Sequence, residues 1–84
     1  MFKIVLSSVT QKFLKKCNKE LYERLLKKIR SLSDEPYPSD SRRVIGRADK
    51  AFRVRVGDYR ILYVVYSDKN EVLISEIDKR SRIY

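Results

Sequence analysis

Residues 52–61 read FRVRVGDYRI, and this stretch predicts a β-hairpin. Gly57 and Asp58 form its two-residue loop, in which a glycine at the first position accepts the positive φ of a type II′ turn. On either side of the loop, successive side chains alternate between two faces. The apolar face is expected to lie in the core and collects Phe52, Val54, Val56, Tyr59, Ile61 and Tyr63.

The other face of the predicted hairpin carries three arginines. Counting outward from the loop pairs Arg55 with Arg60 and places Arg53 beside them. Like charges directly opposite each other destabilise a sheet by up to about 1 kcal/mol, so folding gives no reason for this pair. A bound phosphate gives one, because the planar guanidinium matches phosphate oxygens and stays charged. The alternatives are a charged edge that prevents aggregation and ion pairs with acids such as Asp58 or Glu76.

The first part of the chain predicts a strand followed by two helices. Residues 2–6 are an apolar run of β-formers, and Ser7 and Ser8 supply an N-cap for a short helix. Asn18 predicts a break and a new N-cap for a longer one. The apolar positions recur at helical spacing, as Val9, Phe13, Leu14 and Cys17 in the first helix and Leu21, Tyr22, Leu25, Leu26, Ile29 and Leu32 in the second.

The polar side of the longer helix carries a run of charges. Such runs usually form a solvated face, and the sequence alone assigns them no chemistry. The residues are Arg24, Lys27, Lys28 and Arg30, beside Glu20 and Glu23.

The second part of the chain predicts a sheet. Residues 33–41 hold both prolines and predict a loop, and residues 42–47 predict a short strand or extended segment before a turn at 48–50. From Ala51 the pattern has period two, with a second turn at 68–70 whose register stays open by one residue. This layout predicts a two-layer α+β fold, in which an N-terminal strand and a helical hairpin pack on a twisted, mainly antiparallel sheet. Residues 1–84 are expected to form one domain.

The composition is strongly basic. Lys and Arg number 20 and Asp and Glu 11, which gives a net charge of +9 and a sequence pI of about 9.9. A polyanion such as a nucleic acid is the expected partner. An anionic membrane surface, or a basic protein that is merely soluble, is the alternative.

Several kinds of site are excluded or disfavoured by the residues at hand. The sequence has no histidine, which excludes His-based triads and His metal sites. Its one cysteine, Cys17, forms no intramolecular disulfide and favours a cytoplasmic location. The scattered acids lack metal-ligand spacing and the two glycines form no phosphate-cradling loop, so no metal or cofactor is expected. No signal peptide or membrane span is expected either.

The hairpin and the basic C-terminal run together resemble the RelE/ParE superfamily of toxin-antitoxin toxins. The resemblance is carried by residues 45–63 and by the closing KRSRIY of residues 79–84. The RelE branch has two basic residues at alternate positions before the turn, one arginine just after it, and an arginine and a tyrosine near the C-terminus. All five positions are filled here, by Arg53, Arg55, Arg60, Arg80 and Tyr84, which favours the RelE branch.

The resemblance implies a function as well as a RelE-like fold. RelE-type toxins are ribosome-dependent endoribonucleases that cut mRNA in the ribosomal A site without a metal. By this likeness Tyr84 is the general base, Arg80 assists the leaving oxygen, and Arg53, Arg55 and Arg60 hold the phosphate. The implied partners are a RelB-like antitoxin, the ribosome and mRNA, in the cytoplasm. A ParE-like inhibitor of DNA gyrase and a non-enzymatic basic nucleic-acid-binding module remain as alternatives, and the oligomeric state stays open.

Overall fold

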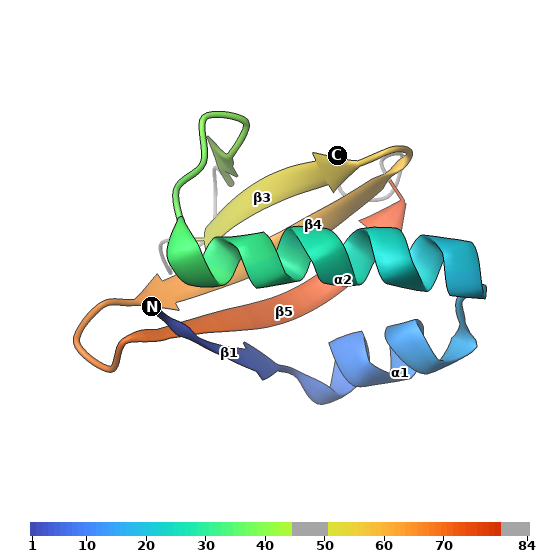
Figure 1. The fold of residues 1–84 in the computed structure, drawn as a ribbon, viewed down its shortest axis with the longest axis horizontal. Helices are drawn as coiled ribbons and strands as arrows, with labels where there is room; N and C mark the ends of the chain where they lie inside the picture. The colour runs from blue at the N-terminus through green and yellow to red at the C-terminus, as the bar shows by residue number, and fades with distance from the viewer. Residues whose placement is uncertain (45–50, 80–84) are drawn as a thin grey trace.

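The computed structural model describes residues 1–44 and 51–79 of the chain. Two helices cover one face of a five-stranded sheet, which confirms the predicted two-layer α+β architecture (Figure 1). The strand order is β1-β5-β4-β3-β2. The elements are β1 (Lys3–Leu6), α1 (Ser8–Lys16), α2 (Lys19–Asp34), β2 (Arg42–Arg43), β3 (Ala51–Val56), β4 (Tyr59–Tyr66) and β5 (Glu71–Lys79).

Both helices begin at the predicted caps. The hydroxyl oxygen of Ser7 accepts a hydrogen bond from the backbone N–H of Thr10, and the side chain of Asn18 accepts one from Leu21 at 2.8 Å. The two caps satisfy N–H groups that have no partner inside the helix. A sharp change of direction between α1 and α2 follows, because Cys17 and Asn18 are both extended.

The core lies between α2 and the helix-facing side of the sheet. Leu25, Ile29 and Leu32 of α2 are at most 1% exposed and pack on apolar side chains of the three long strands. Those strand residues are Val54, Ile61, Tyr63, Val72, Ile74 and Ile77. Apolar burial of this kind stabilises a fold by about 25 cal/mol per Å², so this layer supplies much of the stability.

The prediction was wrong for Val9, which is 57% exposed instead of lying on the buried side of α1. Thr10 takes the inward position and is fully buried, with its hydroxyl donating to the carbonyl oxygen of Ile74 at 2.9 Å. A buried hydroxyl with a partner is stable in a core, so the polar residue sets the rotation of the helix. Tyr22, expected on the stripe of α2, is also exposed.

The N-terminal strand lies beside the C-terminal part of the chain. β1 pairs with β5 in parallel, from Lys3 opposite Glu71 to Leu6 opposite Ile74, whereas the other three strand pairs are antiparallel. The sheet is therefore mixed, in keeping with the mainly antiparallel sheet that the sequence predicts.

A β-bulge in β5 changes which side chains face the helices. Leu62 lies opposite Glu76 and Tyr63 lies opposite Ile74, which leaves Ser75 as the extra residue. Its carbonyl oxygen accepts a hydrogen bond from the Ser7 hydroxyl at 2.7 Å. The bulge shifts the alternation by one, so that residues 74 and 77 both lie in the core and the acids at 76 and 78 face away from the helices.

Candidate functional site

The β3–β4 hairpin has the predicted register. Arg55 lies opposite Arg60, and Arg53 lies opposite Leu62, so the three arginines share the face that points away from the helices. Gly57 has a φ of +59°. The φ of Asp58 is not positive, whereas a type I′ turn would require a positive φ at both loop residues. This backbone agrees with the predicted type II′ turn.

The arginines border a cavity of about 320 Å³ at the outer edge of β3. β2 pairs only with the first part of β3, and no other strand among the described residues pairs with this edge from Val54 onward. The lining residues are Asp40, Arg42, Arg53, Val54, Arg55 and Arg60. Four guanidinium groups around one small cavity make a site suited to a phosphate or another oxyanion.

Local hydrogen bonds orient these side chains. Nε of Arg55 donates to the carbonyl oxygen of Gly57 at 3.1 Å, and Nη1 of Arg42 donates to the carbonyls of Ser39 and Ser41 at 3.0 and 2.9 Å. Nη1 of Arg53 makes a longer contact of 3.4 Å with the carbonyl oxygen of Arg43. Anchored guanidinium groups lose less conformational entropy when they bind an anion than free ones do.

Arg60 differs from the other arginines in its burial. It is only 4% exposed, whereas Arg55 is exposed. The bulge in β5 places Asp78 directly opposite Arg60, and a buried charge requires such a counter-charge nearby. Glu76 lies one strand beyond Arg53, across Leu62. The arginine face therefore has an acidic border on the β5 side.

Asp40 is a member of the site that the sequence analysis missed. Its carboxylate accepts a hydrogen bond from Nζ of Lys28 at 2.8 Å, and this bond lowers the pKa of Asp40. Asp40 lies in the loop after α2, where neither periodicity nor turn chemistry places it near the hairpin. Arg42 was missed as well. The sequence analysis predicted an extended segment at residues 42–47 but did not predict which strand it pairs with or which face Arg42 occupies.

Two of the five predicted site residues, Arg80 and Tyr84, lie outside the described residues. The structure brings together the other three and adds Asp40 and Arg42. Within residues 1–44 and 51–79, no group of His, Cys, Asp and Glu side chains could hold a metal ion. No helix in that part of the chain is long and apolar enough to span a membrane.

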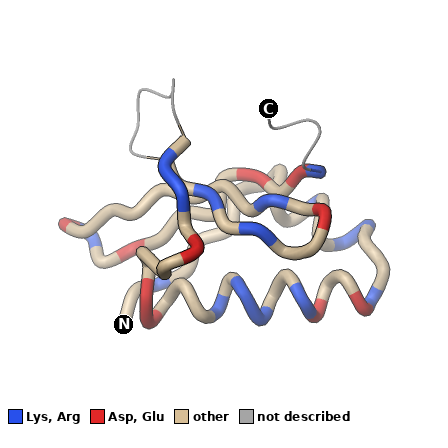
Figure 2. The backbone as a smooth tube through the Cα atoms, turned by 90° about the horizontal axis from the view of Figure 1, so that it is seen from above, with Lys and Arg blue, Asp and Glu red and all other residues tan. Residues whose placement is uncertain are grey.

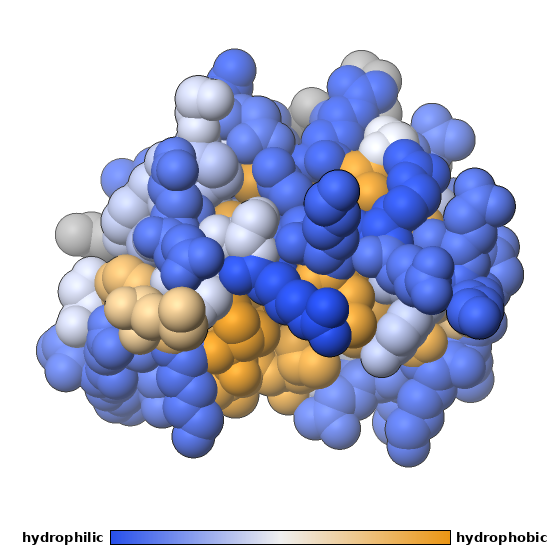
Figure 3. All heavy atoms as spheres, viewed as in Figure 1, coloured by the Kyte–Doolittle hydropathy of each residue, from blue (hydrophilic) through white to orange (hydrophobic). Residues whose placement is uncertain are grey.

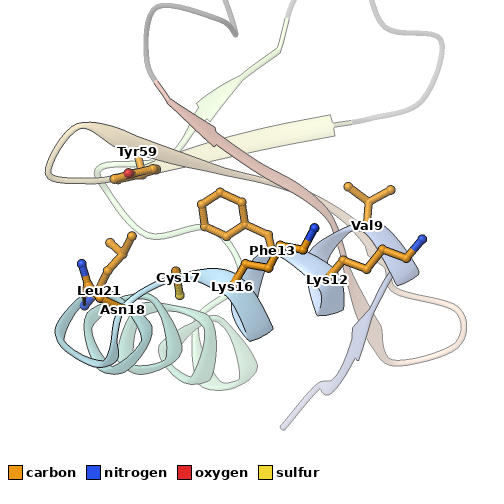
Figure 4. Close-up of a pocket in the computed structure, with 8 residues that line it drawn as sticks. All are labelled: Val9, Lys12, Phe13, Lys16, Cys17, Asn18, Leu21 and Tyr59. Carbon is orange, nitrogen blue, oxygen red and sulfur yellow. Dashed lines mark hydrogen bonds between the residues drawn. The ribbon is translucent and has the colours of Figure 1, made fainter.

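A second, apolar cavity of about 440 Å³ lies between α1, the start of α2 and the hairpin (Figure 4). Phe13 and Tyr59 make an edge-to-face contact there, with ring centroids 5.8 Å apart. Lys12 and Lys16 also line it. The lining combines apolar side chains with basic ones, as expected of a groove for an amphipathic partner with acidic residues.

Fold and site together define a small α+β protein with a basic, phosphate-compatible hairpin face. A family model described as the ParE toxin of the type II toxin-antitoxin system, parDE, matches residues 4–84. The chain belongs to this family, within the RelE/ParE superfamily of toxins from type II toxin-antitoxin systems.

Relatives within the superfamily carry the RelE name. The chain is 30% identical over 87 residues to a protein of Methanocaldococcus jannaschii designated toxin RelE1, an alignment that covers 82% of this chain and 96% of the relative. The toxin in the crystal structure of the archaeal RelE-RelB complex from Pyrococcus horikoshii OT3 is 28% identical, with a TM-score of 0.83 over 96% of this chain and 97% of that one. Isolated E. coli RelE has the same fold at 20% identity, with a TM-score of 0.80 over 94% of this chain and 84% of that one.

Proposed function

We propose that this toxin is a metal-independent endoribonuclease that cuts mRNA in the A site of the ribosome and so stops translation. The observation that carries the proposal is the cluster of Arg53, Arg55 and Arg60 around one cavity. Preorganised cations of this kind stabilise the extra negative charge of a phosphate in a transition state. Membership of the RelE/ParE superfamily supports the same reading.

In the proposed reaction, the 2′-hydroxyl of a nucleotide attacks its own 3′-phosphate. A bond forms between O2′ and phosphorus, the bond from phosphorus to the 5′ oxygen breaks, and a 2′,3′-cyclic phosphate and a 5′-hydroxyl result. Tyr84, as the phenolate, accepts the proton of the 2′-hydroxyl. Arg80 donates a hydrogen bond to the leaving oxygen, which takes its proton from water. The roles of Tyr84 and Arg80 rest on the family resemblance.

The arginine cavity lies at the edge of a sheet, and the ribosome is the proposed source of substrate alignment. Free RNA should therefore be cut slowly. We propose a cytoplasmic location as well, because ribosomes and mRNA are in the cytoplasm.

We further propose a RelB-like antitoxin as the partner that neutralises the toxin. The structures of RelE toxins from P. horikoshii and M. jannaschii are complexes with RelB, which supports an antitoxin of that type here. Both surfaces described above suit an acidic partner. The apolar groove beside Phe13 would take an amphipathic segment, and the arginine face would take carboxylates.

Mapping of mRNA 5′ ends on translating ribosomes after induced expression tests the nuclease. The wild type should produce new ends at A-site codons, and Tyr84→Phe should produce none while still binding ribosomes. Tyr22→Phe is the matched control, because Tyr22 is an exposed tyrosine on α2 and belongs to neither cavity lining. Cleavage by Tyr84→Phe at the wild-type rate would contradict the proposed general base.

A second candidate is inhibition of DNA gyrase, because the matching family model is that of ParE. A gyrase inhibitor would block supercoiling of plasmid DNA by purified gyrase and leave mRNA intact. If the purified toxin blocks supercoiling and no new mRNA ends appear, this second function replaces the first.

A further inference from the structure

A second basic groove lies on the other side of β3, between that strand and α2. It has a volume of about 580 Å³. Its lining residues are Arg24, Lys27, Lys28, Ser31, Arg55, Val56 and Gly57. Every ionisable side chain in this lining is a cation. Figure 2 shows Lys and Arg on α2 and on the neighbouring hairpin, and hydrophilic side chains dominate the surface above α2, toward β3, in Figure 3.

The helix contributes one continuous row to this groove. Residues 24, 27, 28 and 31 have the spacing of a single helical face, and this face points toward the edge of β3. The sequence alone favoured a solvated face for these cations. The fold instead gathers part of that face, at Arg24 and Lys27, beside Arg55, an arginine of the hairpin that lies far from them in the sequence.

Two of the guanidinium groups are held at the turn of the hairpin. A Cβ atom built on Gly57 would lie 3.0 Å from Nη2 of Arg24, so this guanidinium rests directly against the turn. Nε of Arg55 donates to the carbonyl oxygen of the same Gly57. The glycine thus permits both the positive φ and the close approach of Arg24. Both guanidinium groups therefore lie beside the same turn.

The groove concentrates like charge, and only part of it is offset. Lys28 pairs with Asp40 at 2.8 Å, whereas Arg24, Lys27 and Arg55 line the groove without a carboxylate among its described lining residues; Glu20, one turn before Arg24, lines a neighbouring pocket. Three such cations close together repel one another, which destabilises the fold and favours a bound anion. Arg55 lines this groove and also the arginine cavity at the edge of β3, so the two basic sites are contiguous.

We infer that Arg24 and Lys27 form a second phosphate-binding subsite for the backbone of an RNA strand. The strand would cross the open edge of β3, with one phosphate in the arginine cavity and a neighbouring phosphate in the groove beside α2. Arg55 stands between the two positions. This inference rests on the proposed function for the identity of the ligand as RNA, and it adds a binding contact that involves no chemistry at the scissile bond.

The test is binding of a short, unstructured RNA oligonucleotide with 2′-O-methyl groups, which cannot be cut by 2′-hydroxyl attack. Fluorescence anisotropy at several salt concentrations gives the affinity and its salt dependence for the full-length protein. The test variant is Arg24→Gln with Lys27→Gln. The control is Arg30→Gln with Lys3→Gln, which removes the same charges from another side of α2 and from β1, at the opposite edge of the sheet. Thermal unfolding checks that both double variants are folded.

Loss of the one phosphate contact in the groove should lower the slope of log affinity against log salt by about 0.7 for the test variant. The affinity at about 0.1 M salt should then fall about 5-fold. The control should keep most of the wild-type slope. Equal losses in both double variants, no loss in the test variant, or no measurable binding by the wild type would overturn the inference. So would binding to vesicles of anionic lipid that is tighter than RNA binding and shows the same loss.

This experiment separates the inference from the proposed nuclease. The oligonucleotide cannot be cleaved, so the groove is tested even if no new mRNA ends appear on ribosomes. The opposite outcome is also distinguishable. If the wild type cuts mRNA on the ribosome but Arg24→Gln with Lys27→Gln leaves the RNA affinity unchanged, the proposed nuclease is supported and the second subsite is ruled out.

Discussion

On the helix side of the sheet, the long strands present apolar side chains that α2 buries, whereas on the other side the same strands carry arginines and carboxylates. The helix-facing side can be predicted from the alternation of apolar and polar residues along the strands and from the apolar stripe of α2. The other side depends on register, because Arg55 meets Arg60 through the hairpin count and Asp78 meets Arg60 only through the bulge at Ser75. One face thus provides stability, and the other concentrates charge.

The largest effect is expected from a cavity on the helix side. Leu25 is fully buried in the core cluster, so Leu25→Ala should lower the free energy of unfolding by about 2 to 5 kcal/mol. Tyr22→Ala is the control on the same helix, at an exposed position, and should cost far less. Urea denaturation measures both. Similar losses for the two variants would mean that α2 does not bury the face described above.

On the arginine face, a substitution should separate stability from activity. Arg55→Gln removes one of two like charges that lie directly opposite each other, so the free energy of unfolding should stay level or rise by up to about 1 kcal/mol. Under the proposed function, it also removes a transition-state contact, and ribosomal cleavage should slow by about 100- to 1000-fold. Denaturation and single-turnover cleavage measure the two quantities. If Arg55→Gln lowers the free energy of unfolding enough to account for the slower cleavage, the role of Arg55 is structural.

Tyr63 makes the helix side sensitive to alkaline pH. It is fully buried, its hydroxyl donates to the carbonyl oxygen of Pro36 at 2.7 Å, and burial raises its pKa to about 12. Because the pKa of Tyr63 is higher in the folded state, the neutral phenol's contribution to the free energy of unfolding is fully present below about pH 10. This contribution is lost as the pH rises toward 12. The loss should be on the order of 2 kcal/mol.

Tyr63→Phe is the variant that tests this pH dependence. It should be less stable than the wild type at neutral pH, by about 1 kcal/mol for the missing hydrogen bond. The gap should close and then reverse between pH 10 and pH 12, because only the wild type loses stability there, as measured by denaturation at each pH. A gap that stays constant over this range would show that the phenol of Tyr63 does not contribute to alkaline unfolding.

The sequence predicted the helices and the first hairpin because their signals are local. Caps at Ser7 and Asn18 and the Gly57 turn act within a few residues, and the structure confirms each. The parallel pairing of β1 with β5 and the bulge at Ser75 depend on contacts between distant segments. No periodicity encodes such contacts.

The candidate site follows the same division. Arg53, Arg55 and Arg60 were predicted because they share one hairpin, and the structure places them on one face. Asp40 reaches the cavity from the loop after α2, and Arg42 reaches it from β2, where it lies opposite Arg53, so only the three-dimensional fold could add them. The roles of Arg80 and Tyr84 remain predictions from the family resemblance.

The smallest effect is expected at the Lys28–Asp40 ion pair, which joins α2 to the loop that follows it. The bond from Lys28 lowers the pKa of Asp40, so its contribution to stability is present above the unfolded pKa, near 4, and is lost as the pH falls below it. The pair is partly exposed, with 25% and 50% of the two side chains accessible, so its contribution should be about 0.2 to 1 kcal/mol and should decrease with salt. Asp40→Asn should reproduce this loss at neutral pH in denaturation experiments, and its difference from the wild type should vanish as the pH falls through the lowered pKa of Asp40. It should also raise RNA affinity slightly, because a carboxylate leaves the lining of the arginine cavity and Lys28 becomes available to an anion. Weaker RNA binding by Asp40→Asn would show instead that Asp40 orients the basic side chains, and that Lys28 contacts the ligand only when Asp40 holds it in position.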